Sequence, residues 1–304
     1  MPSAAITSSA DMQGGPAAAR ERLRAWAEVA LALGETAQAS FVRREISEAL
    51  GITDASRADL YELFVKELPP FASVYLSDEG SIGGAARSAI AGFYHVLGVP
   101  APSDPDHLSS LLALLYSVLM KEADLHEEVA ARSDVRLASV ERARSVLTGE
   151  HLLSWLPAYL IRAREIAPDG LSGWVSCAWD LASVLSNWDD GCAETDEGVG
   201  ELASALADTA PEFVDWITTP SRSGLIIAPS DIAEVADALG LAPRAGRKRF
   251  VLEELITQAG WQGVRARLAG IASRQEMQFA SRAEEFSSLR LWAAKARRAA
   301  ELLS

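Results

Sequence analysis

The fold class can be read from residues 105–119, Pro-Asp-His-Leu-Ser-Ser-Leu-Leu-Ala-Leu-Leu-Tyr-Ser-Val-Leu. After the first three residues, apolar side chains occupy most faces of a helix with 3.6 residues per turn. Such a pattern predicts a long, central helix that is buried on nearly every side. Pro105 is typical of a residue just before a helix, so we expect the helix to begin near Leu108.

The same helical spacing continues on both sides of this segment. It predicts helices over residues 16–34, 36–50, 57–68, 85–97, 136–147, 171–188, 201–207, 211–217, 229–239, 248–259, 262–273 and 275–303, and an apolar run from residue 150 to 161. Only Leu225-Ile226-Ile227 resembles a strand, and it is very short. Because no strands alternate with helices, the sequence predicts an all-α fold.

Composition excludes several classes of protein. Of 304 residues, 49% are hydrophobic and 23% are charged, so the chain can bury a core and is not disordered over most of its length. The two cysteines, Cys177 and Cys192, fit neither a metal knuckle nor a disulfide framework, which favours the cytoplasm. We expect no membrane span, because no apolar run approaches the required length, and we expect a flexible tail over residues 1–15.

Charge is distributed unevenly along the chain. The net charge is −14, which argues against nucleic-acid binding. Residues 222–304 hold 13 basic and 9 acidic residues, a net of +4, whereas the first 221 residues hold 15 and 33, a net of −18. The difference predicts that the C-terminal stretch is a separate unit, with a linker near residues 218–224.

Two histidines directly follow a carboxylate, as Asp106-His107 and Glu150-His151. One interpretation is a helical metal hydrolase in which both pairs hold an ion. The other is structural: Asp106 caps the long helix, and His107 bonds to a neighbouring loop. No phosphate-binding, dinucleotide-binding, nucleophile-elbow or zinc-protease motif is present, which weakens the enzyme interpretation.

Two aromatic segments allow a binding or a structural interpretation. The loop Pro69-Pro70-Phe71-Ala72-Ser73-Val74-Tyr75 either plugs the core or grips a peptide. Trp155, next to a proline-bent helix, is either a core residue or an anchor in a groove. The acidic run between Asp189 and Glu197 is either a solvated loop or a docking patch for arginines.

These segments, in this order, resemble the TorD/DmsD/NarJ family of cytoplasmic chaperones for molybdenum-cofactor enzymes. The resemblance covers roughly residues 20–217. It is carried by Tyr61 with Leu63-Phe64, Pro69 to Tyr75, Phe93-Tyr94 with Leu97-Gly98-Val99, Pro105-Asp106-His107-Leu108, and Glu150-His151-Leu152-Leu153-Ser154-Trp155-Leu156-Pro157 with Tyr159.

The resemblance implies a TorD-like helical bundle that is not an enzyme. It implies binding of an apo-molybdoenzyme catalytic subunit, of its twin-arginine leader, or of both, until the cofactor is loaded. The family's peptide-binding positions correspond here to Pro70, Phe71, Ser73, Tyr75, Asp106 and His107, and its second motif to Glu150, His151 and Trp155. No catalytic residue, metal or cofactor of the chaperone itself is expected.

The chemistry of a twin-arginine leader fits these residue types. Such a peptide presents two guanidinium groups followed by an apolar stretch, so its receptor needs carboxylates and an aromatic groove. We expect Asp106 to be an arginine partner, and Phe71, Tyr75 and Trp155 to form the groove walls. The acidic charge of residues 1–221 would speed the encounter with such a peptide.

The chain departs from the family in its length. We divide it into a tail (1–15), a TorD-like domain (16–217) and a helical C-terminal extension (218–304) with basic clusters at 247–249 and 295–298. The extension could dock on the acidic body, contact the client or favour a homodimer, and the proline-rich connection 100–105 could act as a hinge for domain swapping. Two alternatives stay open: a metal hydrolase using Asp106, His107, Glu150 and His151, and a regulatory adaptor using the basic C-terminal helices.

Overall fold

The computed structural model describes residues 16–38, 43–52, 55–128, 135–188, 210–242 and 246–304. Every regular element in these ranges is a helix, which confirms the all-α prediction. The expected tail, the predicted helix at 201–207, Cys192 and the acidic run after residue 188 lie outside the described residues. None of the described helices is both long enough and apolar enough to cross a membrane.

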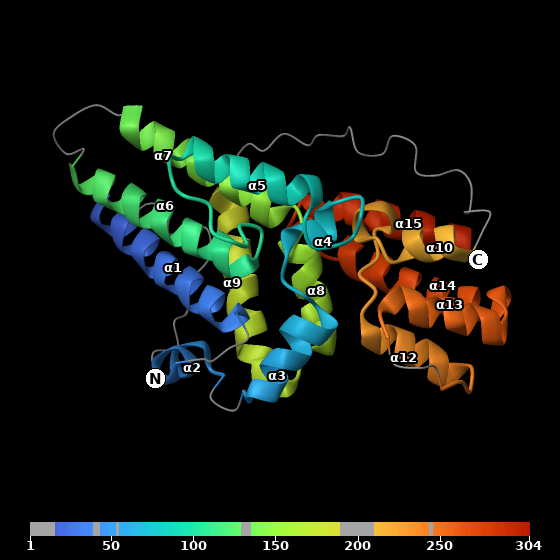
Figure 1. The fold of residues 1–304 in the computed structure, drawn as a ribbon. Coiled ribbons are helices and arrows are strands. Elements are labelled where there is room, and N and C mark those ends of the chain that lie inside the picture. The colour runs from blue at the N-terminus through green and yellow to red at the C-terminus, as the bar shows by residue number, and fades with distance from the viewer. Residues whose placement is uncertain (1–15, 39–42, 53–54, 129–134, 189–209, 243–245) are drawn as a thin grey trace.

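Helices α1 (Pro16–Ala37) and α6 (Leu108–Glu128) lie along each other at one end of the molecule, and α7 (Val135–Val146) packs on α6 (Figure 1). Gly34 was expected to end the first helix, and that prediction is wrong. The helix continues because Gly34 lies inside its contact with α6, where a Cβ atom would come within 3.3 Å of the Ser109 backbone. This glycine therefore allows close helix packing instead of stopping the helix.

The middle of the molecule contains the most deeply buried helices. Here α8 (Leu156–Ile166) and α9 (Ser172–Trp188) run between the two ends (Figure 1), and every residue from Leu156 to Ala163 is buried. Shorter elements surround them: α2 (Arg44–Leu50), α3 (Arg57–Tyr61), η2 (Glu62–Glu67), α4 (Ala72–Leu76), α5 (Gly84–Val96), η3 (Leu147–Leu153) and η4 (Asp169–Leu171). The predicted helix over 36–50 is thus shorter than expected, since α2 begins at Arg44.

Two of these short elements, η2 and η3, are π-helical turns. Each ends directly before a segment that the sequence analysis singled out, Leu68-Pro69-Pro70 in one case and Ser154-Trp155 in the other. A π-helical turn is wider than an α-helical turn, and such turns often occur at functional sites.

The C-terminal helices gather at the opposite end (Figure 1). They are α10 (Ala210–Ile217), α11 (Pro220–Ser223), α12 (Pro229–Ala238), α13 (Lys248–Ala259), α14 (Trp261–Ala280) and α15 (Ser288–Leu303), with α14 and α15 lying along each other. The predicted helix break near Ser273 is wrong, because α14 continues to Ala280 and the turn follows it.

The residues Leu225-Ile226-Ile227 do not form a strand. Instead, the side-chain amide of Gln275 bonds both backbone groups of Ile226: the Ile226 N–H donates to Oε1 at 2.9 Å, and Nε2 donates to the Ile226 carbonyl at 3.1 Å. One side chain thereby satisfies the buried backbone groups that a neighbouring strand would have satisfied.

A buried ion pair joins the C-terminal helices to α8. Arg162, fully buried on α8, donates from Nη2 to both carboxylate oxygens of Asp231 on α12, at 2.9 and 2.8 Å. Its Nε donates to the Ile226 carbonyl at 3.2 Å, and the guanidinium also contacts Glu165. Every side of this buried cation therefore has a partner, as a charge in a protein interior requires.

Candidate functional site

Two of the segments highlighted by the sequence lie side by side at the start of α6. The Ala72 N–H donates to the Asp106 carbonyl at 2.9 Å, and the Leu108 N–H donates to the Pro70 carbonyl at 2.8 Å. Phe71 and His107 form the antiparallel bridge between them. The structure thus joins the aromatic loop to the Asp-His pair through backbone hydrogen bonds.

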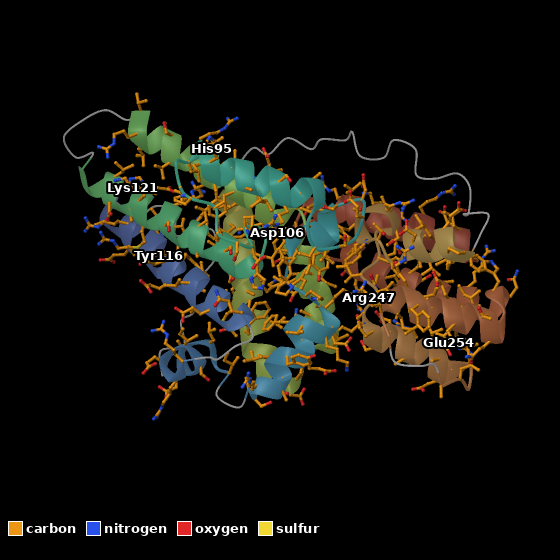
Figure 2. All side chains as sticks on the ribbon, viewed as in Figure 1. His95, Asp106, Tyr116, Lys121, Arg247 and Glu254 are labelled. Carbon is orange, nitrogen blue, oxygen red and sulfur yellow. The ribbon has the colours of Figure 1, made fainter. Side chains whose placement is uncertain are left out.

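Asp106 is fully buried at the centre of this junction (Figure 2). Its Oδ2 accepts hydrogen bonds from the Ser73 hydroxyl and from the Ser73 N–H, the second at 3.4 Å. The Ser73 hydroxyl oxygen in turn accepts from the Gly83 N–H at 3.1 Å. The Asp106 carboxylate therefore binds the first turn of α4 and, through Ser73, fixes the loop before α5; it does not cap α6.

The other carboxylate oxygen of Asp106, Oδ1, is buried and has no hydrogen bond. The charge nearest to it belongs to Arg87 on α5, whose Nε lies 3.8 Å away. Arg87 is 44% exposed, and its Nη2 donates to the Ser103 carbonyl at 2.6 Å. A mobile-length, half-exposed arginine thus lies over a buried carboxylate oxygen that still has capacity to accept.

His107 has a local structural role at the start of α6. Its Nδ1 accepts from the Ser109 N–H at 3.1 Å and lies 2.6 Å from the Ser109 hydroxyl, which places the ring proton on Nε2. Its ring meets Phe71 edge-on, with centroids 4.7 Å apart. Burial lowers the pKa of His107, although Asp104 and Asp106 act in the opposite direction.

Three buried aromatic residues connect the first and second motifs. Tyr75 stacks on Trp155 at 5.2 Å, and Tyr159 meets both rings edge-on at 5.5 Å. The Tyr75 hydroxyl donates to the Pro69 carbonyl and the Tyr159 hydroxyl to the Leu68 carbonyl, at 3.0 and 3.2 Å. Burial raises the pKa of both tyrosines well above the usual value. These rings hold the double-proline segment from beneath.

Glu150 and His151 belong to η3, on the far side of the aromatic cluster. Glu150 is exposed, whereas His151 is half-buried with its ring 5.1 Å from that of Phe93 on α5. Burial lowers the pKa of His151, and Glu150 opposes this effect. The Trp155 indole donates to the His151 carbonyl at 2.9 Å, so the second motif is also bonded internally.

The nine residues highlighted by the sequence therefore differ in accessibility. Glu150 is exposed, and Phe71, His107 and His151 are half-buried, so these four reach the surface. The remaining five are buried and position the others: Pro70, Ser73, Tyr75, Asp106 and Trp155. In this conformation Tyr75 and Trp155 stack on each other inside the core and do not line an open groove.

Helices of the C-terminal extension contact both motifs, which sequence reasoning missed. From α15, the Ser288 hydroxyl and the Trp292 indole donate to the carbonyls of Leu153 and Ser154, at 2.6 and 3.0 Å. From α11, the Ser221 hydroxyl donates to the carbonyl of Ser77, just beyond the aromatic loop, at 2.8 Å. No periodicity or spacing signals these contacts, because they depend on how distant helices pack.

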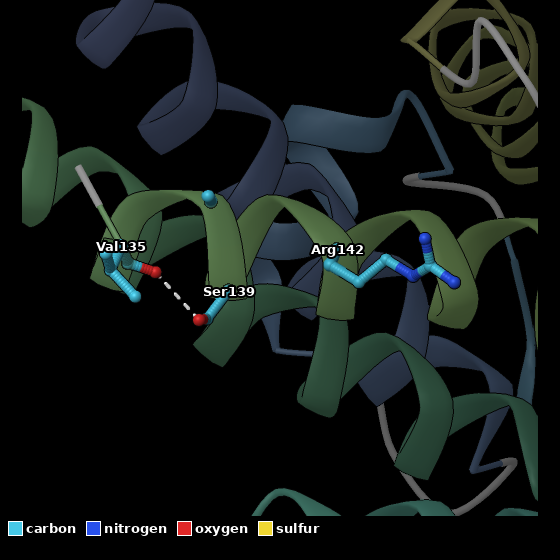
Figure 3. Close-up of a pocket in the computed structure, with 4 residues that line it drawn as sticks. Val135, Ser139 and Arg142 are labelled. Carbon is cyan, nitrogen blue, oxygen red and sulfur yellow. Dashed lines mark hydrogen bonds between the residues drawn. The ribbon is translucent and has the colours of Figure 1, made fainter.

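The described surface hollows lie elsewhere. One is a shallow depression on α7 lined by Val135, Ala138, Ser139 and Arg142 (Figure 3). A more enclosed cleft of about 440 Å³ lies between α8, α9 and Arg282, next to Trp179. Neither is lined by any of the nine residues above.

The hydrolase alternative finds no support in the geometry. Among the described residues, the group of His and acidic side chains close enough to share a metal ion is Glu122, His126 and Glu141. It contains neither the Asp106-His107 pair nor the Glu150-His151 pair. The Nδ1 atom of His107 is, moreover, already engaged by Ser109.

The basic clusters of the extension are largely engaged within the protein. Lys248 directs its amine to the Ile227 carbonyl at 2.9 Å, and Lys295 to the Ser221 carbonyl at 2.7 Å. Arg249 pairs with Asp215, and Arg297 with Glu276, both at 2.7 Å. These contacts leave little of the free positive charge that an adaptor for nucleic acid would need.

The described helices define an all-α protein of the TorD-like bundle class. Residues 17–160 match the family model described as nitrate reductase delta subunit, and this part of the chain belongs to that family of molybdoenzyme maturation chaperones. The match confirms the resemblance noted from the sequence motifs. Among curated proteins and among solved structures, nothing matches the chain.

Proposed function

We propose that this chain is a cytoplasmic, non-enzymatic chaperone for a molybdopterin-dependent oxidoreductase. It binds the twin-arginine leader of the apo-enzyme, its catalytic subunit, or both, and holds the client for cofactor insertion before export or assembly. The observation that carries the proposal is the buried Oδ1 of Asp106, which lacks a hydrogen bond and is covered by the guanidinium of Arg87.

Arg87 occupies the place that a leader arginine would take. A carboxylate binds a guanidinium best through short, charge-assisted hydrogen bonds, and Arg87 at 3.8 Å makes none to Oδ1. Because Arg87 is 44% exposed, it can move aside without unfolding the site. An arginine of the client can then reach Oδ1 while Ser73 continues to hold Oδ2.

The accessible members of the two motifs suit the rest of such a peptide. Phe71 and His107 present apolar and aromatic surface next to Asp106, and Glu150 adds a second, exposed carboxylate. The buried members, including Tyr75 and Trp155, keep the double-proline loop rigid. Rigid positioning reduces the ordering cost of binding.

The extension takes part in this function as a brace in our proposal. We retain the division into a TorD-like domain over 16–217 and an extension over 218–304. The bonds from Ser221, Ser288 and Trp292 let the extension hold both motifs in place. A homodimer formed through the 100–105 connection also remains a proposal.

The test is binding of a fluorescent twin-arginine leader peptide, followed by anisotropy. Asp106→Asn should weaken binding by about tenfold or more, because the buried charge is lost while the side-chain shape is kept. Asp104→Asn is the matched control, since Asp104 is an exposed aspartate two residues away and should leave affinity unchanged. Equal affinity in the Asp106→Asn variant, with an intact circular dichroism spectrum, would overturn the proposal.

A further inference from the structure

A second group of polar side chains lies far along α6 from the client site. Glu122 and His126 stand four residues apart on α6, which places them on one face of the helix. Glu141 reaches the same point from α7, and the three ligand atoms all lie within 4.8 Å of one another. Glu122 is 14 residues beyond Leu108, or about 21 Å along the helix axis.

The Glu122 carboxylate is held in a defined orientation. It is buried, and its Oε2 accepts from the Arg144 Nε at 2.8 Å. The Arg144 guanidinium in turn lies 5.4 Å from the ring centre of Trp188, which anchors it on the other side. Metal-binding carboxylates are commonly oriented by hydrogen bonds of this kind.

The charge of the group suits a cation. Glu122 and Glu141 carry two negative charges at neutral pH, and Arg144 offsets one of them. With a neutral imidazole at His126, one net negative charge remains in a partly buried place. Such a place attracts a divalent cation more strongly than an exposed carboxylate pair does.

We propose that Glu122, His126 and Glu141 bind one divalent first-row transition ion, with zinc as the best fit, and thereby tie α6 to α7. An imidazole and two carboxylates suit such ions, and solvent completes the coordination. Ligand atoms at about 2.0–2.2 Å from zinc lie roughly 3–3.6 Å apart, so the side chains need to close by only about 1 Å. This closure requires changes of side-chain rotamer and no movement of either helix.

The probe is Co²⁺ added to the full-length, metal-free protein, because its visible absorption reports both binding and coordination. We expect one equivalent to bind with oxygen and nitrogen ligands and to raise Tm. His126→Ala and Glu141→Gln should each weaken binding by about tenfold or more. Two substitutions are used because Glu122→Gln would also leave Arg144 without its partner and might therefore change the fold.

The matched controls are His95→Ala and Glu45→Gln, which remove an exposed histidine on α5 (Figure 2) and an exposed glutamate on α2. Both should bind Co²⁺ as the unaltered protein does. Three results would overturn the proposal: no bound Co²⁺, unchanged affinity in both ligand variants, or a sulfur-to-cobalt charge-transfer band that assigns the ion to a cysteine. Leader binding is measured separately, so the client proposal stands or falls independently.

Discussion

The guanidinium of Arg87 lies over the buried carboxylate of Asp106, with Nε 3.8 Å from Oδ1. Oδ2 is engaged by Ser73, whereas Oδ1 has no hydrogen bond. Arg87 is therefore the charge that offsets the free oxygen, and it does so from a half-exposed position. A carboxylate held in this way can exchange one guanidinium for another without moving.

This relationship predicts the effect of removing the internal arginine. Arg87→Gln should tighten binding of a twin-arginine peptide by about two- to fivefold, because the weak, partly exposed ion pair no longer competes. Fluorescence anisotropy measures the change. Arg164→Gln, which removes an exposed arginine on α8, should have no effect. If Arg87→Gln weakened binding as much as Asp106→Asn, Arg87 would be a client contact and not a competitor.

The buried pair of Arg162 and Asp231 predicts a large loss of stability. Asp231→Ala should lower the free energy of unfolding by about 3–5 kcal/mol, because it leaves a buried guanidinium without its main partner. The comparison is Glu276→Ala, which breaks the pair with Arg297, a residue exposed to 63%. That change should cost under about 1 kcal/mol. Urea unfolding of both variants measures the difference, and equal costs would contradict the assignment.

Truncation tests whether the extension is a brace or an independent unit. A chain that ends at residue 217 loses Asp231 and Gln275, and it exposes the apolar surface that Leu225 and Ile226 cover. We expect the shortened protein to aggregate or to lose cooperative unfolding. Circular dichroism and size-exclusion chromatography detect both outcomes. A monomeric truncated protein with a sharp transition would show that the extension is dispensable for folding.

Stability should depend on pH through the two half-buried histidines. Burial lowers the pKa of His107 and of His151 below the value of about 6.5 expected in the unfolded chain. As pH falls below about 6.5, the unfolded chain takes up protons that the folded chain resists, so the free energy of unfolding decreases. The urea midpoint should therefore drop between about pH 7.5 and 5.5.

The doubly substituted protein, with His107→Asn and His151→Gln, should show a smaller drop over the same range. Asn at 107 can still accept the Ser109 N–H through its side-chain oxygen. Identical drops in both proteins would assign the pH effect to other groups.

The fold class could be predicted because apolar residues from Leu108 to Leu119 cover most faces of one helix. Helix ends were harder to predict, because a glycine stops a helix or admits a neighbour depending on what packs against it. Gly34 admits α6, and its helix continues to Ala37. Leu225 to Ile227 has the composition of a strand, but its partner is the Gln275 side chain.

Part of the candidate site could also be recognised from the sequence. The resemblance pointed to Asp106 and Ser73, which are hydrogen-bonded to each other. It could not identify Arg87, because that contact depends on how α5 packs over the start of α6. Nor could local reasoning decide which helix Asp106 serves. Its carboxylate binds α4, and His107 accepts from the first turn of α6.

The two π-helical turns make the chain sensitive to its length at two points. A π-helical turn corresponds to an α-helix with one inserted residue. Deleting a single residue from η3 would let that turn relax to α-helical geometry. Everything after it would then rotate by about 100° around the helix axis. Trp155 would leave its stack with Tyr75, so relatives that share this architecture should conserve the residue count here more strictly than the residues themselves.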